Sequence, residues 1–129
     1  MATYAQIDTS QFPLVVITFM EKTSSDEDFE RYLSEMKDLY EARKNLAIIF
    51  DARNAPLPSL KQQQKQAAWL RRNNDLLNEF CAGTAYVITK GTVRMILRVI
   101  FSITPQAAPY KVCSNMNDAE EWARAQLSA

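Results

Sequence analysis

The stretch Leu46-Ala-Ile-Ile-Phe-Asp51 decides the fold class of this chain. Its five apolar residues end on a carboxylate, and a short run without alternating polar residues is typical of a central parallel strand covered on both faces. Pro56 and Pro58 then interrupt the chain, and Ser59, with Gln62 three positions later, opens a helix that we expect to reach about Phe80. A strand, a loop and a helix in this order predict a parallel α/β sheet.

The residues before this strand predict a hairpin and a helix. Residues 3–8 and 14–20 have strand character, and a turn over residues 9–13, which end in Pro13, would pair them antiparallel. Ser24 and Glu27 form a capping-box pattern for the helix that follows. One face of this helix is expected in the core, because apolar residues recur at helical spacing: Phe29, Leu33, Met36 and Tyr40.

The residues after the second helix predict two more strands and two more helices. Gly83 is expected to end the helix in a left-handed conformation, and residues 84–88 to form a buried strand. A helix over residues 92–103, a strand over 110–113 and a helix over 117–127 complete the chain. We therefore predict one domain over residues 1–129, an α/β fold of about five mostly parallel strands with an N-terminal antiparallel hairpin and about four helices.

The composition excludes several classes of site. The 129 residues include no histidine, two cysteines and two glycines, so no histidine-based triad, histidine-ligated metal or glycine-rich phosphate loop is available. The acidic cluster Asp26, Glu27 and Asp28 is explained by its place in a helix's first turn. Cys81 and Cys113 are expected to be reduced core residues. We predict no metal, no cofactor and no enzymatic activity, and the absence of a signal or membrane-span pattern favours the cytoplasm.

Charge is unevenly distributed although the net charge is zero. Residues 1–50 carry five Lys/Arg against nine Asp/Glu, whereas residues 51–115 carry nine against three. Lys61, Lys65 and Arg72 share one helical face, which is either an ordinary solvated face or a basic surface for an acidic partner, a phosphorylated loop or anionic lipid. Nucleic acid is not expected as a partner, because no aromatic residues alternate with the basic ones.

The predicted helix over residues 92–103 carries more apolar surface than one side of a sheet can cover. Arg94, Arg98 and Ser102 form a narrow polar line along it, and Met95, Val99 and Ile103 flank that line. Apolar residues bordered by arginine favour an interface, so these positions are predicted to form a homodimer seam or a groove for a partner helix. The alternative is that the chain's own sheet and second helix cover them.

The element order, the stretch 46–51 leading to Ser59, and the ending Asn117-Asp-Ala-Glu-Glu-Trp122 together resemble the STAS domain of bacterial anti-sigma-factor antagonists. The stand-alone STAS-like proteins, which are sometimes compared with the Sec14 lipid-binding fold, are the more similar group. The resemblance implies a bacterial regulatory or scaffolding module that binds proteins and performs no chemistry. A carrier of a small apolar or lipid ligand is the alternative that it implies.

The resemblance also singles out Ser59 as a phosphorylation site. In the antagonists of this family, a partner kinase phosphorylates a serine at the start of the corresponding helix, within a sequence of the type Asp-Ser-Ser-Gly. Here the loop reads Asp51-Ala-Arg-Asn-Ala-Pro-Leu-Pro-Ser59, so Ser59 is either a helix cap alone or a cap that is also a switch. The predicted contact surface joins this loop, with Asp51 and Arg53, to helix 92–103. Asp51 is expected to anchor the loop by accepting backbone hydrogen bonds.

Overall fold

The computed structural model describes residues 4–20, 25–55, 59–91, 94–95, 98 and 108–128. Its strands are β1 (Ala5–Asp8), β2 (Leu14–Phe19), β3 (Leu46–Asp51), β4 (Cys81–Val87) and β5 (Tyr110–Cys113). Its helices are α1 (Asp26–Asp38), the 3-10 helix η1 (Leu39–Ala42), α2 (Leu60–Arg72), α3 (Asn74–Phe80) and α5 (Met116–Ser128). The strands form one sheet in the order β1-β2-β3-β4-β5, in which β1 is antiparallel to β2 and the other pairs are parallel. The α/β class, the hairpin and the five strands are confirmed.

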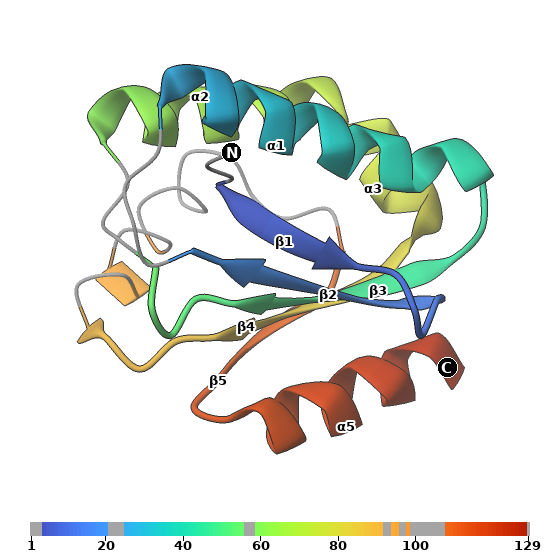
Figure 1. The fold of residues 1–129 in the computed structure, drawn as a ribbon. Helices are drawn as coiled ribbons and strands as arrows, with labels where there is room; N and C mark the ends of the chain where they lie inside the picture. The colour runs from blue at the N-terminus through green and yellow to red at the C-terminus, as the bar shows by residue number, and fades with distance from the viewer. Residues whose placement is uncertain are drawn as a thin grey trace.

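The sheet lies between two helical layers. Helices α1, α2 and α3 cover one face and α5 covers the other, as Figure 1 shows. Side chains of β3 alternate between the two: Ile48 and Phe50 pack with the first layer, Ala47 and Ile49 with α5. All six residues of β3 are buried, which explains why this strand shows no polar alternation.

Both long helices of the first layer begin with the side-chain caps that their sequences encode. The α2 prediction is confirmed, because the Ser59 side chain accepts from Gln62 N and the Gln62 side chain accepts from Ser59 N, each at 3.1 Å. The α1 prediction was one residue early, because the capping box consists of Ser25 and Asp28. An aspartate at the third helical position closes the box as a glutamate would. The sequence therefore contains two overlapping capping-box patterns, Ser24 with Glu27 and Ser25 with Asp28, and the second one forms.

The single helix expected up to Phe80 is two helices. Asn73 leaves the helical conformation (φ −109°, ψ 15°), and its side-chain amide donates to Trp69 O at 2.9 Å. A side chain that bonds to the backbone in this way competes with the helical hydrogen-bond pattern, which ends α2. The chain then restarts as α3, which buries Leu77 and Phe80.

Gly83 is not the helix stop that we predicted. No described glycine has a positive φ, and Gly83 lies inside β4, which begins at Cys81 rather than at residue 84. A Cβ built on Gly83 would lie 2.8 Å from Gln126 Cγ and 3.0 Å from the tip of Trp122. The residue is therefore needed for the close approach of α5 to the sheet, and not for backbone freedom.

The expected core faces are confirmed on α1 and α5. Phe29, Leu33 and Met36 are buried on α1, and Tyr40 is buried on η1, which continues it. Ala119 and Ala123 of α5 are also buried, with Trp122 and Leu127 packed beside them. In the region of the expected helix over 92–103, residues 91, 94, 95 and 98 are helical. Val99 and Ile103 lie outside the described residues. Within the described residues, no helix combines the length and the hydropathy that a membrane crossing requires.

Candidate binding surface at the carboxyl ends of the strands

The loop after β3 is held by Asp51. Its carboxylate accepts three hydrogen bonds from Arg53, from the backbone N at 3.2 Å, Nε at 2.9 Å and Nη2 at 2.8 Å. These hydrogen bonds from Arg53 hold the pKa of Asp51 below its ordinary value. The expected anchoring role is confirmed for the Arg53 amide and extends to the guanidinium. Asp51 is buried, so Arg53 is the member of this pair that a partner can reach.

The chain segment that follows β4 begins beside this loop. β3 and β4 are paired in parallel up to Asp51 and Val87, and Ala52 N donates to Val87 O at 2.9 Å. Both segments therefore leave the sheet at the same edge. Arg94 folds back over this edge and donates from Nε and Nη2 to Ile88 O, at 3.2 and 2.9 Å.

The segments that follow β3 and β4 expose two large apolar side chains. Met95 is 64% exposed and Leu60, directly after Ser59, is 70% exposed. Met95 belongs to the predicted set, whereas Leu60 was missed. The available signal was that Leu60 is an isolated apolar residue before the wholly polar run Lys61-Gln-Gln-Gln-Lys-Gln66. Arg98 is also exposed, three residues after Met95. The described members of the predicted surface lie on two segments that leave one edge of the sheet, and Asp51 is the buried one among them: Asp51, Arg53, Arg94, Met95 and Arg98.

Ser59 is exposed at this edge and serves as the cap of α2. The three cations within six residues of it in sequence already have carboxylate partners: Arg53 binds Asp51, Lys61 Nζ lies 3.0 Å from Asp26 Oδ2, and Lys65 pairs with Glu30. A phosphate on Ser59 would therefore meet backbone N–H groups of the helix terminus and paired, rather than free, basic side chains.

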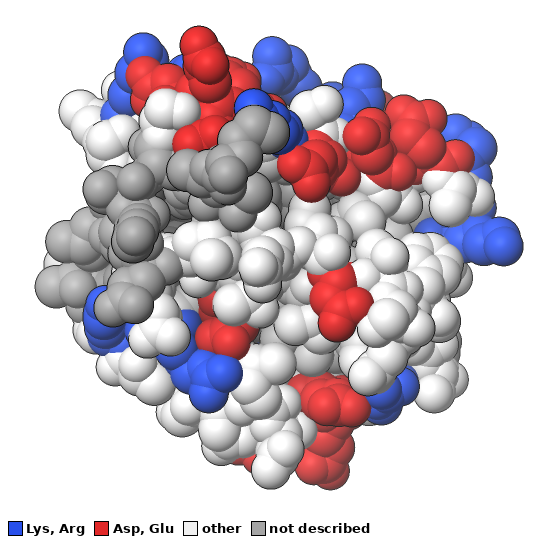
Figure 2. Space-filling view, in the orientation of Figure 1, with Lys and Arg blue, Asp and Glu red and all other residues white. Residues whose placement is uncertain are grey.

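The basic face expected on α2 is largely neutralised by α1. Lys61 pairs with Asp26, and Lys65 pairs with Glu30 one turn further along. These two ion pairs place part of the acidic first third of the chain against part of the basic middle. Figure 2 shows acidic and basic side chains interspersed along the upper rim of this view.

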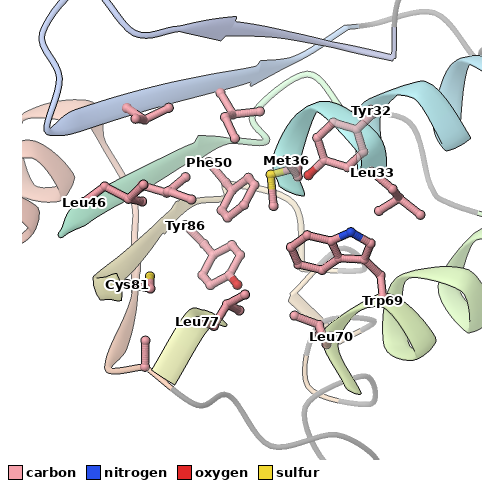
Figure 3. Close-up of a cluster of buried hydrophobic side chains, with 14 of the residues drawn as sticks. Tyr32, Leu33, Met36, Leu46, Phe50, Trp69, Leu70, Leu77, Cys81 and Tyr86 are labelled. Atoms are coloured by element: carbon pink, nitrogen blue, oxygen red, sulfur yellow. The ribbon is translucent and has the colours of Figure 1, made fainter. Parts of the chain in front are cut away.

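The sheet face covered by α1, α2 and α3 carries a row of aromatic rings. Phe19, Phe50 and Tyr86, from adjacent strands, are stacked with centroids 5.7 and 5.2 Å apart. Figure 3 shows Phe50 and Tyr86 beside Met36, Leu77 and Trp69 in one continuous cluster. Burial raises the pKa of Tyr86 and Tyr32 well above the ordinary value of a tyrosine, so these phenols stay neutral. These side chains belong to the buried core between the sheet and α1, α2 and α3.

The described residues assemble no set of metal ligands. No three Asp, Glu, Cys or His side chains among them converge. The acidic cluster Asp26, Glu27 and Asp28 lies in the first turn of α1, as predicted. Asp26 also binds Lys61, and Asp28 closes the α1 capping box. Cys81 and Cys113 are both buried and free, and burial raises the pKa of Cys113.

Comparison with known proteins identifies the fold. The chain is similar to an uncharacterised protein of the DUF3478 family with a SpoIIAA-like fold from Shewanella loihica PV-4. The TM-score is 0.64 at 16% sequence identity, over 92% of this chain and 91% of that one. No protein-family model matches the sequence, and no curated protein is similar enough to match it. The SpoIIAA-like fold is the STAS-like fold expected from the sequence.

Proposed function

We propose that this SpoIIAA-like chain is a non-catalytic, protein-binding regulatory module and that a second copy of the same chain is its first partner. The proposed contact surface consists of Arg53, Leu60, Met95 and Arg98, on the segments that follow β3 and β4. The observation that carries the proposal is the exposure of Met95 and Leu60, at 64% and 70%. Exposed apolar residues bordered by arginine are the composition that interface centres favour.

The chemistry of the described surface supports binding rather than catalysis. Asp51, the one buried carboxylate at this edge among the described residues, is engaged by three donors of Arg53 and has a lowered pKa. A general base requires a pKa near the working pH and access to a substrate. Asp51 has neither property, so its role is to hold the loop that presents Arg53.

Light scattering after size exclusion tests the proposal. The wild-type protein should elute with twice the chain mass of 14.7 kDa and dissociate on dilution. Met95→Asp should give the monomer mass with an unchanged far-UV CD spectrum, because a carboxylate would be desolvated in the interface. Phe12→Asp is the matched control, since Phe12 is 38% exposed in the turn between β1 and β2, at the opposite end of the strands. A wild-type monomer at every concentration, or equal effects of both substitutions, contradicts the proposed dimer.

Ser59 gives this surface a means of regulation. It is exposed and directly precedes Leu60, so a phosphate on its hydroxyl would add negative charge beside the proposed contact. Ser59→Asp should therefore weaken self-association relative to Ser59→Asn. Both replacements are good helix caps, so the pair differs in charge and not in helix start. Equal dimer affinities would reduce Ser59 to a cap.

A further inference from the structure

Helices α1 and α2 run side by side in the same direction over the sheet (Figure 1). Their facing residues are related by a constant offset of 35 positions, as the Asp26–Lys61 and Glu30–Lys65 pairs show. The same offset places Ser34 opposite Trp69 on the next turn. It then places Lys37 opposite Arg72. Two complementary charge pairs are thus followed, at the far end of the same seam, by two cations.

These facing residues line a groove of about 330 Å³ between the helices, together with Glu30, Leu33 and Asn73. Lys37 and Arg72 form no ion pair or hydrogen bond with any described residue, whereas Glu30 is bound to Lys65. A cation in the last turn of a helix is favoured by the helix dipole, which explains each residue singly. It does not explain why the two face one groove, where like charges repel each other.

Trp69 supplies an independent indication of a ligand. Its side chain lines the groove and is only 4% exposed, yet the indole N–H donates to no described residue. In Figure 3 the indole nitrogen lies on the edge of the ring that faces α1 and Leu33. A buried donor without an acceptor costs free energy, and native structures leave few of them. A ligand oxygen in the groove would satisfy it.

From these observations we infer that the α1–α2 groove binds the carboxylate or phosphate group of a small molecule. Lys37 and Arg72 bind the anionic oxygens, and the Trp69 N–H and the Ser34 hydroxyl donate to the same group. Leu33 and the Trp69 ring contact the apolar remainder of the ligand. The volume of about 330 Å³ fits a small ligand, because small-molecule pockets begin at about 300 Å³. This site is separate from the proposed protein-binding edge, so either proposal can fail without the other.

Nuclear magnetic resonance of the indole groups tests the site directly. The chain has two tryptophans, so a 15N-labelled sample gives two indole N–H signals, which Trp122→Phe assigns. Inorganic phosphate and benzoate are titrated separately at constant ionic strength. We expect a saturable shift of the Trp69 signal and a stationary Trp122 signal, because Trp122 lies on α5 across the sheet. The anion with the lower Kd identifies the headgroup class.

Substitutions in the groove provide the second arm. Lys37→Gln and Arg72→Gln should each raise the Kd of the anion by about 10- to 100-fold, the loss expected for one hydrogen bond between charged groups. Lys44→Gln is the matched control, because Lys44 is exposed beyond η1 and outside the groove, and it should leave the Kd unchanged. An unchanged Trp122 signal shows that each variant is folded. A Trp69 signal that does not move with either anion, or an equal loss in Lys44→Gln, overturns the inference.

Discussion

The close approach of α5 to the sheet predicts that Gly83→Ala destabilises the protein. The added methyl group would lie 2.8 Å from Gln126 Cγ, 3.0 Å from the Trp122 ring and 3.1 Å from Gln126 Cβ. Carbon atoms in optimal contact are about 3.5–4.0 Å apart, so the methyl group overlaps three atoms. Overpacking of this kind costs about 1–3 kcal/mol. Gly→Ala also restricts the unfolded chain, which returns about 0.4–1 kcal/mol. The midpoints of these two ranges give an expected net loss of about 1.3 kcal/mol.

Gly91→Ala is the matched control, because no described atom lies within 4 Å of the position where its Cβ would be. Gly91 is helical, so alanine there should stabilise the protein by about 0.5–1 kcal/mol. Both substitutions change the unfolded chain equally, so the difference between them isolates the overlap at α5. Urea unfolding followed by far-UV CD measures both free energies.

Gln126→Ala completes the test as a double-mutant cycle with Gly83→Ala. It removes the Cγ atom at 2.8 Å but leaves Cβ and the Trp122 ring in place. The double variant should therefore recover part of the loss caused by Gly83→Ala. If Gly83→Ala is less than about 0.5 kcal/mol below wild type, or if the two substitutions are additive, the close packing of α5 on β4 is wrong.

Three further predictions follow from single contacts. Ser59→Ala should lower the free energy of unfolding by about 1 kcal/mol, measured in urea, because Gln62 N loses its acceptor; a loss equal to that of Ser59→Asp would contradict the capping role. Asp51→Asn should destabilise the protein at pH 7, because the Arg53 hydrogen bonds favour the ionised carboxylate. In urea titrations at acid pH, the difference in unfolding free energy from wild type should shrink as the pH falls below the ordinary carboxyl pKa of 3.8 and through the lower pKa of the folded protein. A difference that does not change with pH would contradict this. Cys113 should react with a disulfide reagent only after unfolding, since its buried thiol has a raised pKa; fast reaction of the native protein would show that it is accessible.

The sequence predicted those features that local patterns encode. The apolar run of β3, the period of Phe29 and Leu33, and the Ser59 cap each follow from the physical chemistry of a few neighbouring residues, and all three are present in the structure. The error at Gly83 concerns a feature that depends on distant residues. From the local sequence, Gly83 is typical of a helix stop. Only the position of Trp122, which packs against it in the fold, shows why a glycine is needed there.

The candidate site was predictable only in part. Asp51 and the residues around Met95 stand out because parallel strands place their carboxyl ends at one edge. The pairing of the acidic and basic parts of the chain was missed, because it depends on how α1 and α2 align. Once that alignment is known, Lys61 and Lys65 become internal partners and Lys37 and Arg72 stand out instead.

The stacked rings of Phe19, Phe50 and Tyr86 constrain how the strands can assemble. A slip of one residue would turn Phe50 to the opposite side of the sheet, where Ala119 and Ala123 are fully buried against the strands. That side has no space for a benzyl group, so a shifted pairing could not close the second helical layer. In a misaligned intermediate, α5 could not pack on the sheet, and the incorrectly paired strands would dissociate. The order of large and small side chains along β3 thereby selects one strand alignment during folding.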